Sequence, residues 1–255
     1  MKTIAKILAA LVLVSGAWAQ DPQAVQEPTP TVPQKKTRPP YEHRGFFFSA
    51  GLGLAYTDLH AKDEDSDCCG AGTTETTRRD FSGWALPTMD FKFGKSIGNL
   101  VVLHALLDFA LYSGEADYHY SKYYENEGVN LFGISMPKID TKEKEGMETK
   151  AISVSWGLGL MVYPFRNPRS VMNGFYVGIS GGMDFVVVGL FDEYNDFEML
   201  SVFSQYEVGK DWWVSETWSI GFAFSFAMNT AVEMVQAEEG GDRGTFKFLI
   251  RLTRG

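Results

Sequence analysis

Residues of opposite character alternate along most of this chain, and this alternation limits the folds open to it more than any other feature. Near the C-terminal end, Trp218, Phe222 and Phe224 stand at even positions, whereas Gly221 and Ser225 stand at odd ones. Successive side chains of a β-strand point to opposite faces, so the pattern predicts a strand with one apolar face and one small, polar face. The same pattern predicts strands over 45–58, 81–94, 100–114, 150–164, 174–190, 198–209, 216–230 and 244–253.

The length and composition of these segments favour a membrane-spanning barrel. Most of them reach the length that a tilted strand needs to cross a bilayer, which is about 9 to 11 residues. The alternative is a soluble, lipocalin-like barrel with its apolar face inward around a ligand, but its outer face needs many charged and amide side chains. Here the second face is mostly Gly, Ser, Ala and Thr, which suit the narrow interior of an eight-stranded barrel.

A few charged residues interrupt this second face. Because unpaired charges in a barrel interior are costly to desolvate, we expect opposite charges to pair there in a polar network of the lumen. Its predicted members are Asp90, Lys92, His104, Asp108, Asp184, Glu207, Lys247 and Arg251. The network either plugs the barrel or lines a narrow polar pathway, and the plug is favoured because side chains just fill an eight-stranded interior.

The connections between the predicted strands differ in length in a regular way. Those after the second, fourth and sixth strands are short, whereas long loops are expected near 59–80, 115–149 and 231–243, and a shorter loop near 191–197. Outer-membrane barrels have short turns on the periplasmic side and long loops outside. The pattern therefore predicts that these four loops are extracellular and, for an even number of strands, that both termini are periplasmic.

Aromatic residues near the expected strand ends predict the two interfacial girdles of a membrane barrel. One girdle is expected to contain Phe46, Phe93, Tyr163, Phe165, Phe175, Trp212, Trp213 and Trp218, and the other Tyr56, Phe81, Tyr112 and Phe191. Their amphipathic rings suit the headgroup level of a bilayer, so the two sets predict where the apolar belt ends.

The N-terminal residues have the form of a secretory signal. Lys2 and Lys6 precede an apolar run that ends in small residues, which predicts a signal peptide over 1–19. An uncleaved membrane anchor needs about 20 apolar residues, more than this run contains. Residues 20–44 hold six of the ten prolines, which predicts a disordered, Pro-rich periplasmic linker ahead of a barrel over 45–255.

Two stretches carry a resemblance to a known family: FYVGISGGMDF at 175–185 and WSIGFAFSFAMN at 218–229. In this pattern the chain resembles the eight-stranded bacterial outer-membrane barrels, such as the barrel domain of outer membrane protein A and the outer membrane protein W group. The resemblance implies an all-β fold, a closed antiparallel up-and-down transmembrane barrel of about eight strands. It also implies contact with outer-membrane lipid and lipopolysaccharide and, during biogenesis, with the barrel-assembly machinery. Such barrels usually end in an aromatic residue, whereas this chain ends at Gly255.

The net charge argues against a nucleic-acid partner, the cysteine content argues against a metal site, and no cofactor is expected. Removing the signal peptide removes Lys2 and Lys6 and changes the net charge from −9 to −11, which disfavours a nucleic-acid partner. Cys68 and Cys69 are too few for a metal site, so we expect a vicinal disulfide or two loop thiols. The acidic loops lack a twelve-residue calcium loop and are expected to be solvated. Their acidic residues are Asp58, Asp63, Glu64, Asp65, Asp67, Asp192, Glu193, Asp196 and Glu198.

Three functions fit this sequence. The first is a non-enzymatic structural or surface-interaction role, in which loops such as the tyrosine-rich one at 115–149 contact an extracellular ligand. The second is a narrow channel for small solutes through the charged lumen. The third, a lipid-modifying enzyme, needs a nucleophile, a base and an orienting group together near the rim. Its candidates are His60, His119, Ser66 and Ser121, but scattered histidines meet this condition by chance, so the sequence favours a protein that is not an enzyme.

Overall fold

The computed structural model describes residue 43 and residues 45–66, 73–124, 130–131, 134–135, 138–165, 167, 169–189, 197–232 and 239–255. These residues all fall in one compact unit, Tyr41–Gly255. No helix within these ranges is long and apolar enough to cross a membrane. The predicted signal peptide, Cys68 and Cys69 lie outside the described residues, as does the predicted linker apart from His43.

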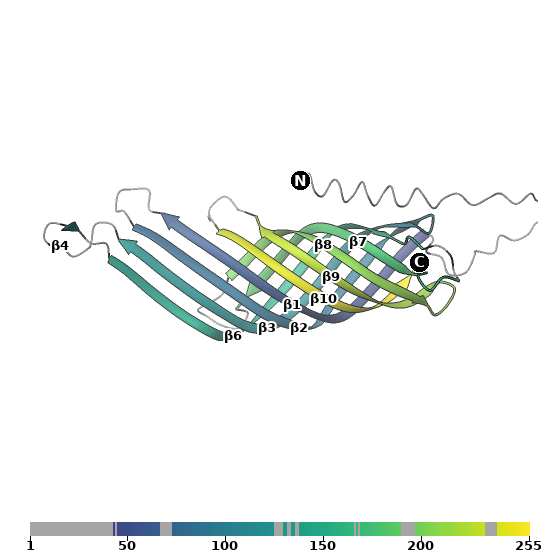
Figure 1. The fold of residues 1–255 in the computed structure, drawn as a ribbon, viewed down its shortest axis with the longest axis horizontal. Coiled ribbons are helices and arrows are strands. Elements are labelled where there is room, and N and C mark those ends of the chain that lie inside the picture. Colours follow the sequence, from purple (N-terminus) through teal and green to yellow (C-terminus); the bar gives the residue numbers. More distant parts are fainter. Residues whose placement is uncertain are drawn as a thin grey trace, which may run out of the picture. The chain divides into compact units, whose positions relative to one another are not determined.

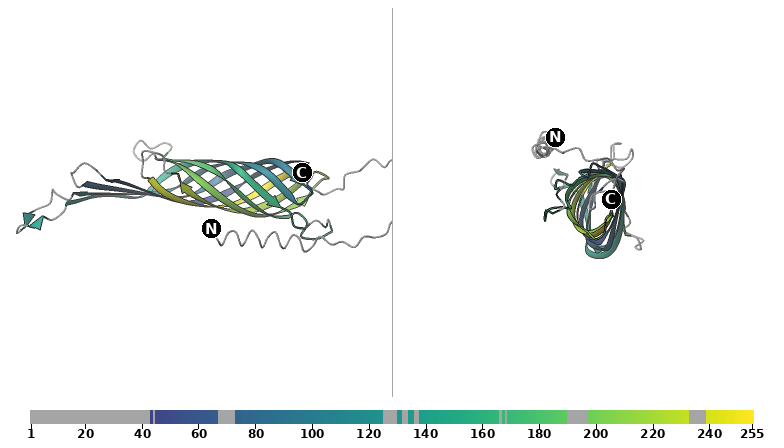
Figure 2. Two further views of the ribbon diagram at one scale, coloured as in Figure 1. Left: turned by 90° about the horizontal axis from the view of Figure 1, so that it is seen from above. Right: turned by 90° about the vertical axis from the view of Figure 1, so that its right-hand side faces the viewer.

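Eight antiparallel strands form a closed ring (Figures 1 and 2). They are β1 (Gly45–Ser66), β2 (Thr73–Ile97), β3 (Val101–Tyr124), β6 (Lys138–Val162), β7 (Phe175–Val188), β8 (Phe197–Trp213), β9 (Trp218–Ala231) and β10 (Glu239–Arg254). The order around the ring is β1-β10-β9-β8-β7-β6-β3-β2, so each strand pairs with its neighbours in the chain and β10 closes against β1. The separate hairpin of β4 (Asn130–Leu131) and β5 (Ile134–Ser135) lies between β3 and β6 in the chain. The predicted closed, up-and-down antiparallel barrel is confirmed.

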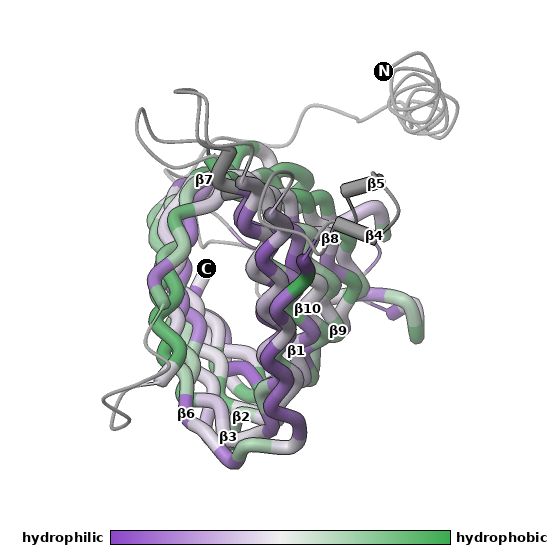
Figure 3. The backbone as a smooth tube through the Cα atoms, turned by 90° about the vertical axis from the view of Figure 1, so that its left-hand side faces the viewer, coloured by the Kyte–Doolittle hydropathy of each residue, from purple (hydrophilic) through white to green (hydrophobic). Residues whose placement is uncertain are grey.

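The alternation of residue character becomes an alternation of burial around the ring. In β9, Ala223 and Ser225 are buried, whereas Phe224 is 52% and Met228 48% exposed. The tube in Figure 3 shows hydrophilic and hydrophobic residues following one another along the strands. Trp156, which the sequence places on the apolar face of its strand, is likewise exposed. The apolar faces of the strands therefore point out of the barrel, which is the reverse of a soluble barrel.

Six strands are longer than the sequence predicts, and the extension is largest in β1, β2, β3 and β6. The expectation of a loop over 59–80 is wrong for most of this range, because β1 and β2 stay paired out to Ser66 and Thr74. The expected loop 115–149 is corrected in the same way, since β3 and β6 stay paired out to Tyr124 and Lys138. These outer segments carry polar and charged residues on both faces, so they lack the apolar face by which the other strands are recognised. Figure 1 shows β2, β3 and β6 running well past the ends of β7 to β10.

Three of the expected girdle residues are buried inside the barrel, and a fourth, Trp213, lies on the inward row of β8 against His43. Phe81, Tyr112 and Tyr163 are buried, with 1%, 0% and 3% of their surface exposed. A break in the β2–β3 register between Ala85 and Thr88 switches the inward residues from odd to even positions, which turns Phe81 inward. Tyr112 simply continues the inward row of its strand. Both interior ends of the barrel thus gain an aromatic side chain.

Both ends of the barrel domain lie at the same rim. Phe48, near the start of β1, pairs with Arg254, at the end of β10. His43 folds over this rim, where its backbone N–H donates to Asn99 Oδ1 (2.8 Å) and its carbonyl accepts from the Ser96 hydroxyl (2.5 Å). We call this end the terminal rim, and the end from which β1, β2, β3 and β6 extend the hairpin rim.

Candidate functional site

The largest group of charges inside the barrel is a four-residue cluster in which every carboxylate meets a cation. Arg251 donates from Nη2 to both oxygens of Asp90 (2.9 and 2.8 Å) and to Glu207 Oε2 (2.7 Å). Lys92 Nζ donates to both oxygens of Glu207 at 2.7 Å and lies 3.8 Å from Asp90. All four side chains are buried, so their charges interact in a medium of low polarity. We call these residues the central cluster.

A second ion pair joins β7 to β10 on the side of the hairpin rim. Arg243 Nη1 donates to Asp184 Oδ2 (2.6 Å), and Arg243 Nη2 donates to the Tyr112 hydroxyl (3.1 Å). Asp184 also accepts from the hydroxyls of Ser153 (2.8 Å) and Ser155 (2.6 Å). The guanidinium on β10 therefore contacts side chains of β1, β3, β6 and β7, and the carboxylate on β7 is also held by two hydroxyls of β6.

A third pair and a neutral contact complete the predicted set. Lys247 Nζ lies 2.7 Å from Asp108 Oδ2, and both side chains are buried. His104 Nε2 lies 3.3 Å from the Ser180 hydroxyl, in an interaction whose donor depends on the histidine tautomer. The structure thus places all eight residues of the predicted network inside the barrel, where seven of them form ion pairs and His104 does not.

Sequence reasoning missed three polar residues of the interior. Arg243 was placed in a loop and Asp211 in a turn, yet each continues the inward period-two row of its strand, through Lys247 and Glu207 respectively. Asp211 accepts from the Tyr163 hydroxyl (3.0 Å). His43 was placed in the linker but is buried at the terminal rim. Gly45, with φ +82°, starts β1 and separates His43 from the alternation of that strand, so no sequence pattern marks His43 as buried.

His43 closes the terminal rim as a neutral aromatic ring. Its ring centroid lies 4.3 Å from that of Tyr163 and 4.6 Å from that of Trp213. Desolvation by burial lowers the pKa of His43 to about 3. Asp211 Oδ2 is 3.9 Å from Nε2, too far for a hydrogen bond, so the ring is uncharged at neutral pH.

Apolar side chains bracket the charged layer at both ends. Along β3, His104 and Asp108 lie between Val102 and Ala110, and along β7, Asp184 lies between Tyr176 and Val186. The cluster on the side of the terminal rim comprises Phe47, Val102, Met161, Tyr163, Tyr176, Ala223 and Leu249. The cluster on the side of the hairpin rim comprises Ala55, Leu59, Phe81, Ala85, Ala110, Tyr112, Ala116, Ala151, Val186, Val188, Phe197 and Met199. The barrel interior is therefore a filled core with a charged middle.

The residues proposed for catalysis do not assemble. His60 Nδ1 lies 2.6 Å from Asp80, and His119 lies 3.8 Å from Glu143, but no hydrogen bond to a serine is found at either histidine among the described residues. The hydroxyl of Ser66 lies outside the described side chains. His104 and Ser180 do meet, but both are buried in the lumen. No group of metal-ligating residues suited to an ion occurs within the part of the chain that the structure describes.

Of the remaining expected loop residues, some lie on strands and some lie outside the described residues. Tyr118, Tyr120, Tyr123 and Tyr124 lie on β3. Asp58, Asp63, Glu64 and Asp65 lie on β1, and Glu198 lies on β8. Asp67, Asp192, Glu193 and Asp196 lie outside the described residues. The acidic clusters are therefore partly strand surface, with side chains spread along an extended backbone.

No protein-family model matches the chain, and no curated protein is similar to it. Solved structures are similar to it at low identity. Outer membrane protein OprG from Pseudomonas aeruginosa is 12% identical with a TM-score of 0.42, over 83% of this chain and 97% of that one. The outer membrane protease OmpT from Escherichia coli is 10% identical with a TM-score of 0.34, over 86% and 99% of the two chains. Ail, the attachment invasion locus protein of Yersinia pestis, is 9% identical with a TM-score of 0.31, over 81% and 98%.

The residues show a ring of eight antiparallel strands with ion pairs inside and apolar side chains outside.

Proposed function

We propose that this chain is a bacterial outer-membrane barrel with a sealed lumen, and that its role is to hold the outer segments of β1, β2, β3 and β6 as an interaction surface outside the cell. One observation carries the membrane assignment: the exposed surface of the ring is apolar while its core is charged. Leu158 is 73%, Ile250 60% and Phe246 59% exposed, whereas Arg251 and Asp90 are buried. Exposing such an apolar surface to water costs free energy, whereas contact with hydrocarbon does not.

The filled interior supports a sealed barrel over the channel alternative. A solute path would have to pass the central cluster and the apolar side chains on both sides of it. The ion pairs there join β2, β8 and β10, so opening a path would separate buried charges. The closed terminal rim at His43 adds a further barrier.

The lengths of the connections at the two rims support periplasmic termini. The terminal rim carries the short connections, such as residues 98–100 and 214–217, while the strands at the hairpin rim continue far beyond the ring. In outer-membrane barrels the short turns face the periplasm. The outer segments would then project from the cell surface.

The absence of an assembled nucleophile and base in the described residues favours a non-enzymatic role. The extended sheet favours recognition, because a rigid paired sheet costs less conformational entropy on binding than a flexible loop.

Cysteine labelling on intact cells tests location and orientation together. Cys68 and Cys69 are first replaced by Ser, and a single cysteine is then placed at Thr141 in the outer segment of β6, or at Ser215 in a turn of the terminal rim. We expect a membrane-impermeant maleimide to label the Thr141→Cys protein on intact cells and the Ser215→Cys protein only after permeabilisation. Labelling of Ser215→Cys on intact cells, or of neither variant before permeabilisation, contradicts the proposal.

A further inference from the structure

The outer segments of four strands form one continuous sheet beyond the ring. Pairing runs without interruption from β1 to β2, from β2 to β3 and, past a bulge near Ala116, from β3 to β6. Leu59 and Phe81, at the base of this sheet, are buried in the barrel interior. The residues that continue their rows therefore face the same way as the interior, and we call this side the inner face.

The inner face combines basic and aromatic side chains. Its described cations are Arg79, Lys122, Lys138, Lys142 and Lys144, its tyrosines are Tyr118, Tyr120 and Tyr124, and its carboxylates are Asp63, Glu75 and Asp140. Two contacts support this assignment, since Nζ of Lys122 lies 5.4 Å and Nζ of Lys138 lies 5.2 Å from the ring centroid of Tyr124. The three side chains thus lie together on one face.

The outer face has the opposite charge. Its described carboxylates are Glu64, Asp80, Asp117, Glu143 and Glu145, and its cations are Lys62 and Arg78. These outer cations are paired, Lys62 with Glu64 and Arg78 with Asp80. The sheet therefore separates charge across its thickness, with positive charge in excess on the inner face and negative charge in excess on the outer face.

Some inner-face cations are available to a ligand. Lys122 is paired with Glu75, and Lys138 lies 3.2 Å from Asp140. Lys142 and Lys144 are exposed, and neither has a carboxylate within ion-pair distance among the described residues. They stand opposite Tyr120 and Tyr118 in the β3–β6 register, so each free cation has an aromatic neighbour on its own face.

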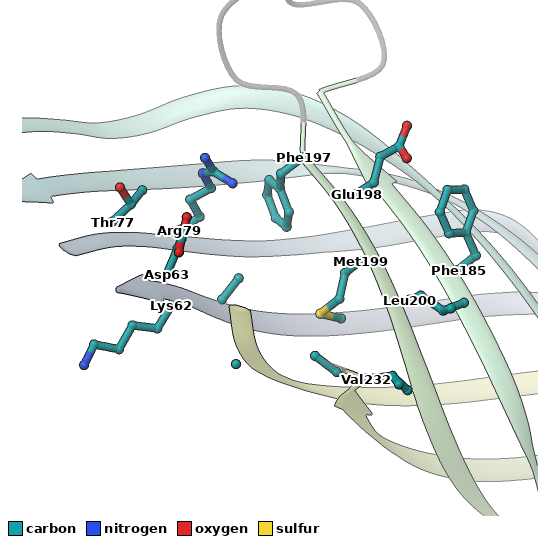
Figure 4. A pocket seen from close by; sticks show the side chains of 13 residues that line it. Lys62, Asp63, Thr77, Arg79, Phe185, Phe197, Glu198, Met199, Leu200 and Val232 are labelled. Atoms are coloured by element: carbon teal, nitrogen blue, oxygen red, sulfur yellow. The ribbon is translucent and has the colours of Figure 1, made fainter. Parts of the chain in front are cut away.

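The base of the inner face opens into a cavity of about 270 Å³ at the hairpin rim (Figure 4). Asp63, Thr77 and Arg79 line it from the sheet, and Phe197 and Met199 line it from β8. Arg79 lies over the Phe197 ring at 5.6 Å from its centroid. The inner face therefore continues at its base into this cavity.

We propose that the inner face binds a soluble anionic polysaccharide. The lysines would contact its acidic groups, and the tyrosine rings would pack against its sugar rings, which combine apolar C–H faces with polar edges. A soluble chain is favoured over the lipopolysaccharide around the barrel, because the surrounding lipid would meet the acidic outer face first. This inference rests on the proposed function, since it needs the outer segments to lie outside the cell.

Binding of fluorescent dextran sulfate to the full chain in phosphatidylcholine vesicles tests the inference, with uncharged dextran as the control polymer. We expect wild-type protein to bind dextran sulfate and not dextran, and binding to weaken steeply as salt is raised from about 0.05 to 0.5 M. The variant Lys142→Gln/Lys144→Gln should bind about tenfold more weakly, because two exposed charge contacts are lost. Tyr120→Leu should weaken binding while leaving the net charge unchanged.

Lys62→Gln/Arg78→Gln is the matched control, since it removes the same charge from the outer face. It should bind within about twofold of wild type. Equal weakening by both double variants, or equal affinity of the wild type for duplex DNA or lipopolysaccharide, overturns the inference. If dextran sulfate does not bind while Thr141→Cys is labelled on intact cells, the inference fails and the proposed function stands. If Thr141→Cys is not labelled on intact cells, the proposed function itself fails, regardless of whether dextran sulfate binds.

Discussion

Replacement of Arg251 by Met is expected to destabilise the barrel strongly, because this guanidinium holds two buried carboxylates. Its Nη2 lies 2.8 and 2.9 Å from the oxygens of Asp90 and 2.7 Å from Glu207. Without it, the one remaining cation of the central cluster is Lys92, which is 3.8 Å from Asp90. Removing one partner of a buried pair costs about 3–5 kcal/mol, since the other charge is left uncompensated.

The double variant Arg251→Met/Asp90→Asn separates this cost from a loss of packing. It leaves Lys92 and Glu207 as an intact pair at 2.7 Å, with no unmatched charge in the cluster. Nε and Nη1 of Arg251 have no hydrogen-bond partner in the described structure, so the wild-type arrangement is itself only partly satisfied. We therefore expect the second substitution to recover most of the lost stability, to within about 1–2 kcal/mol of wild type.

Urea unfolding of the protein in lipid vesicles, followed by loss of the compact band in unboiled electrophoresis, measures these differences. Lys62→Met, an exposed residue of the outer segments, is the control and should change the free energy of unfolding by less than about 1 kcal/mol. The reasoning is refuted if Arg251→Met unfolds like the control, or if adding Asp90→Asn destabilises the barrel further.

Three further predictions concern the terminal rim, the packing and the lumen. Because burial lowers the pKa of His43 below its unfolded value, its contribution is complete above about pH 6.5 and is lost as pH falls toward about 3. His43→Phe should therefore be less acid-sensitive than wild type in the same unfolding assay. Gly209→Ala should cost about 1–3 kcal/mol, since an added Cβ would clash with the Tyr176 ring and with the backbone carbonyl oxygen of Phe222; a neutral effect would contradict this tight packing. In planar bilayers the purified protein should give no steady conductance, and openings that a bulky substitution at Gly157 abolishes would contradict the sealed lumen.

The fold was predictable because hydrocarbon imposes a period of two on every strand that crosses it. That period placed Trp156 and Phe224 outside and Asp184 inside, as the structure has them. It failed beyond the membrane, where both faces of a strand meet water and the segment of β6 from Lys138 reads as a charged loop. It also failed at the bulge near Ala85, where the inward row changes parity.

The sequence predicts which charged residues face the lumen better than it predicts which of them form ion pairs. Alternation identifies which charges point inward, but the partner of each depends on strand tilt and register. Asp184 finds its cation in Arg243, which lies 59 positions further along the chain. The basic and acidic faces of the outer sheet were also not predicted from the sequence, because the register of β2, β3 and β6 decides which side chains share a face.

The direction of the apolar faces in a bilayer is the claim on which the other conclusions depend. Spin labels placed one at a time along β6 from Val154 to Leu160, in a protein without Cys68 and Cys69, measure it through collisions with oxygen and with a water-soluble nickel complex. We expect labels at the even positions, including Trp156 and Leu158, to meet oxygen and not nickel, and labels at the odd positions to meet little of either. Even positions that meet nickel as freely as an exposed aqueous site would contradict a membrane-facing surface.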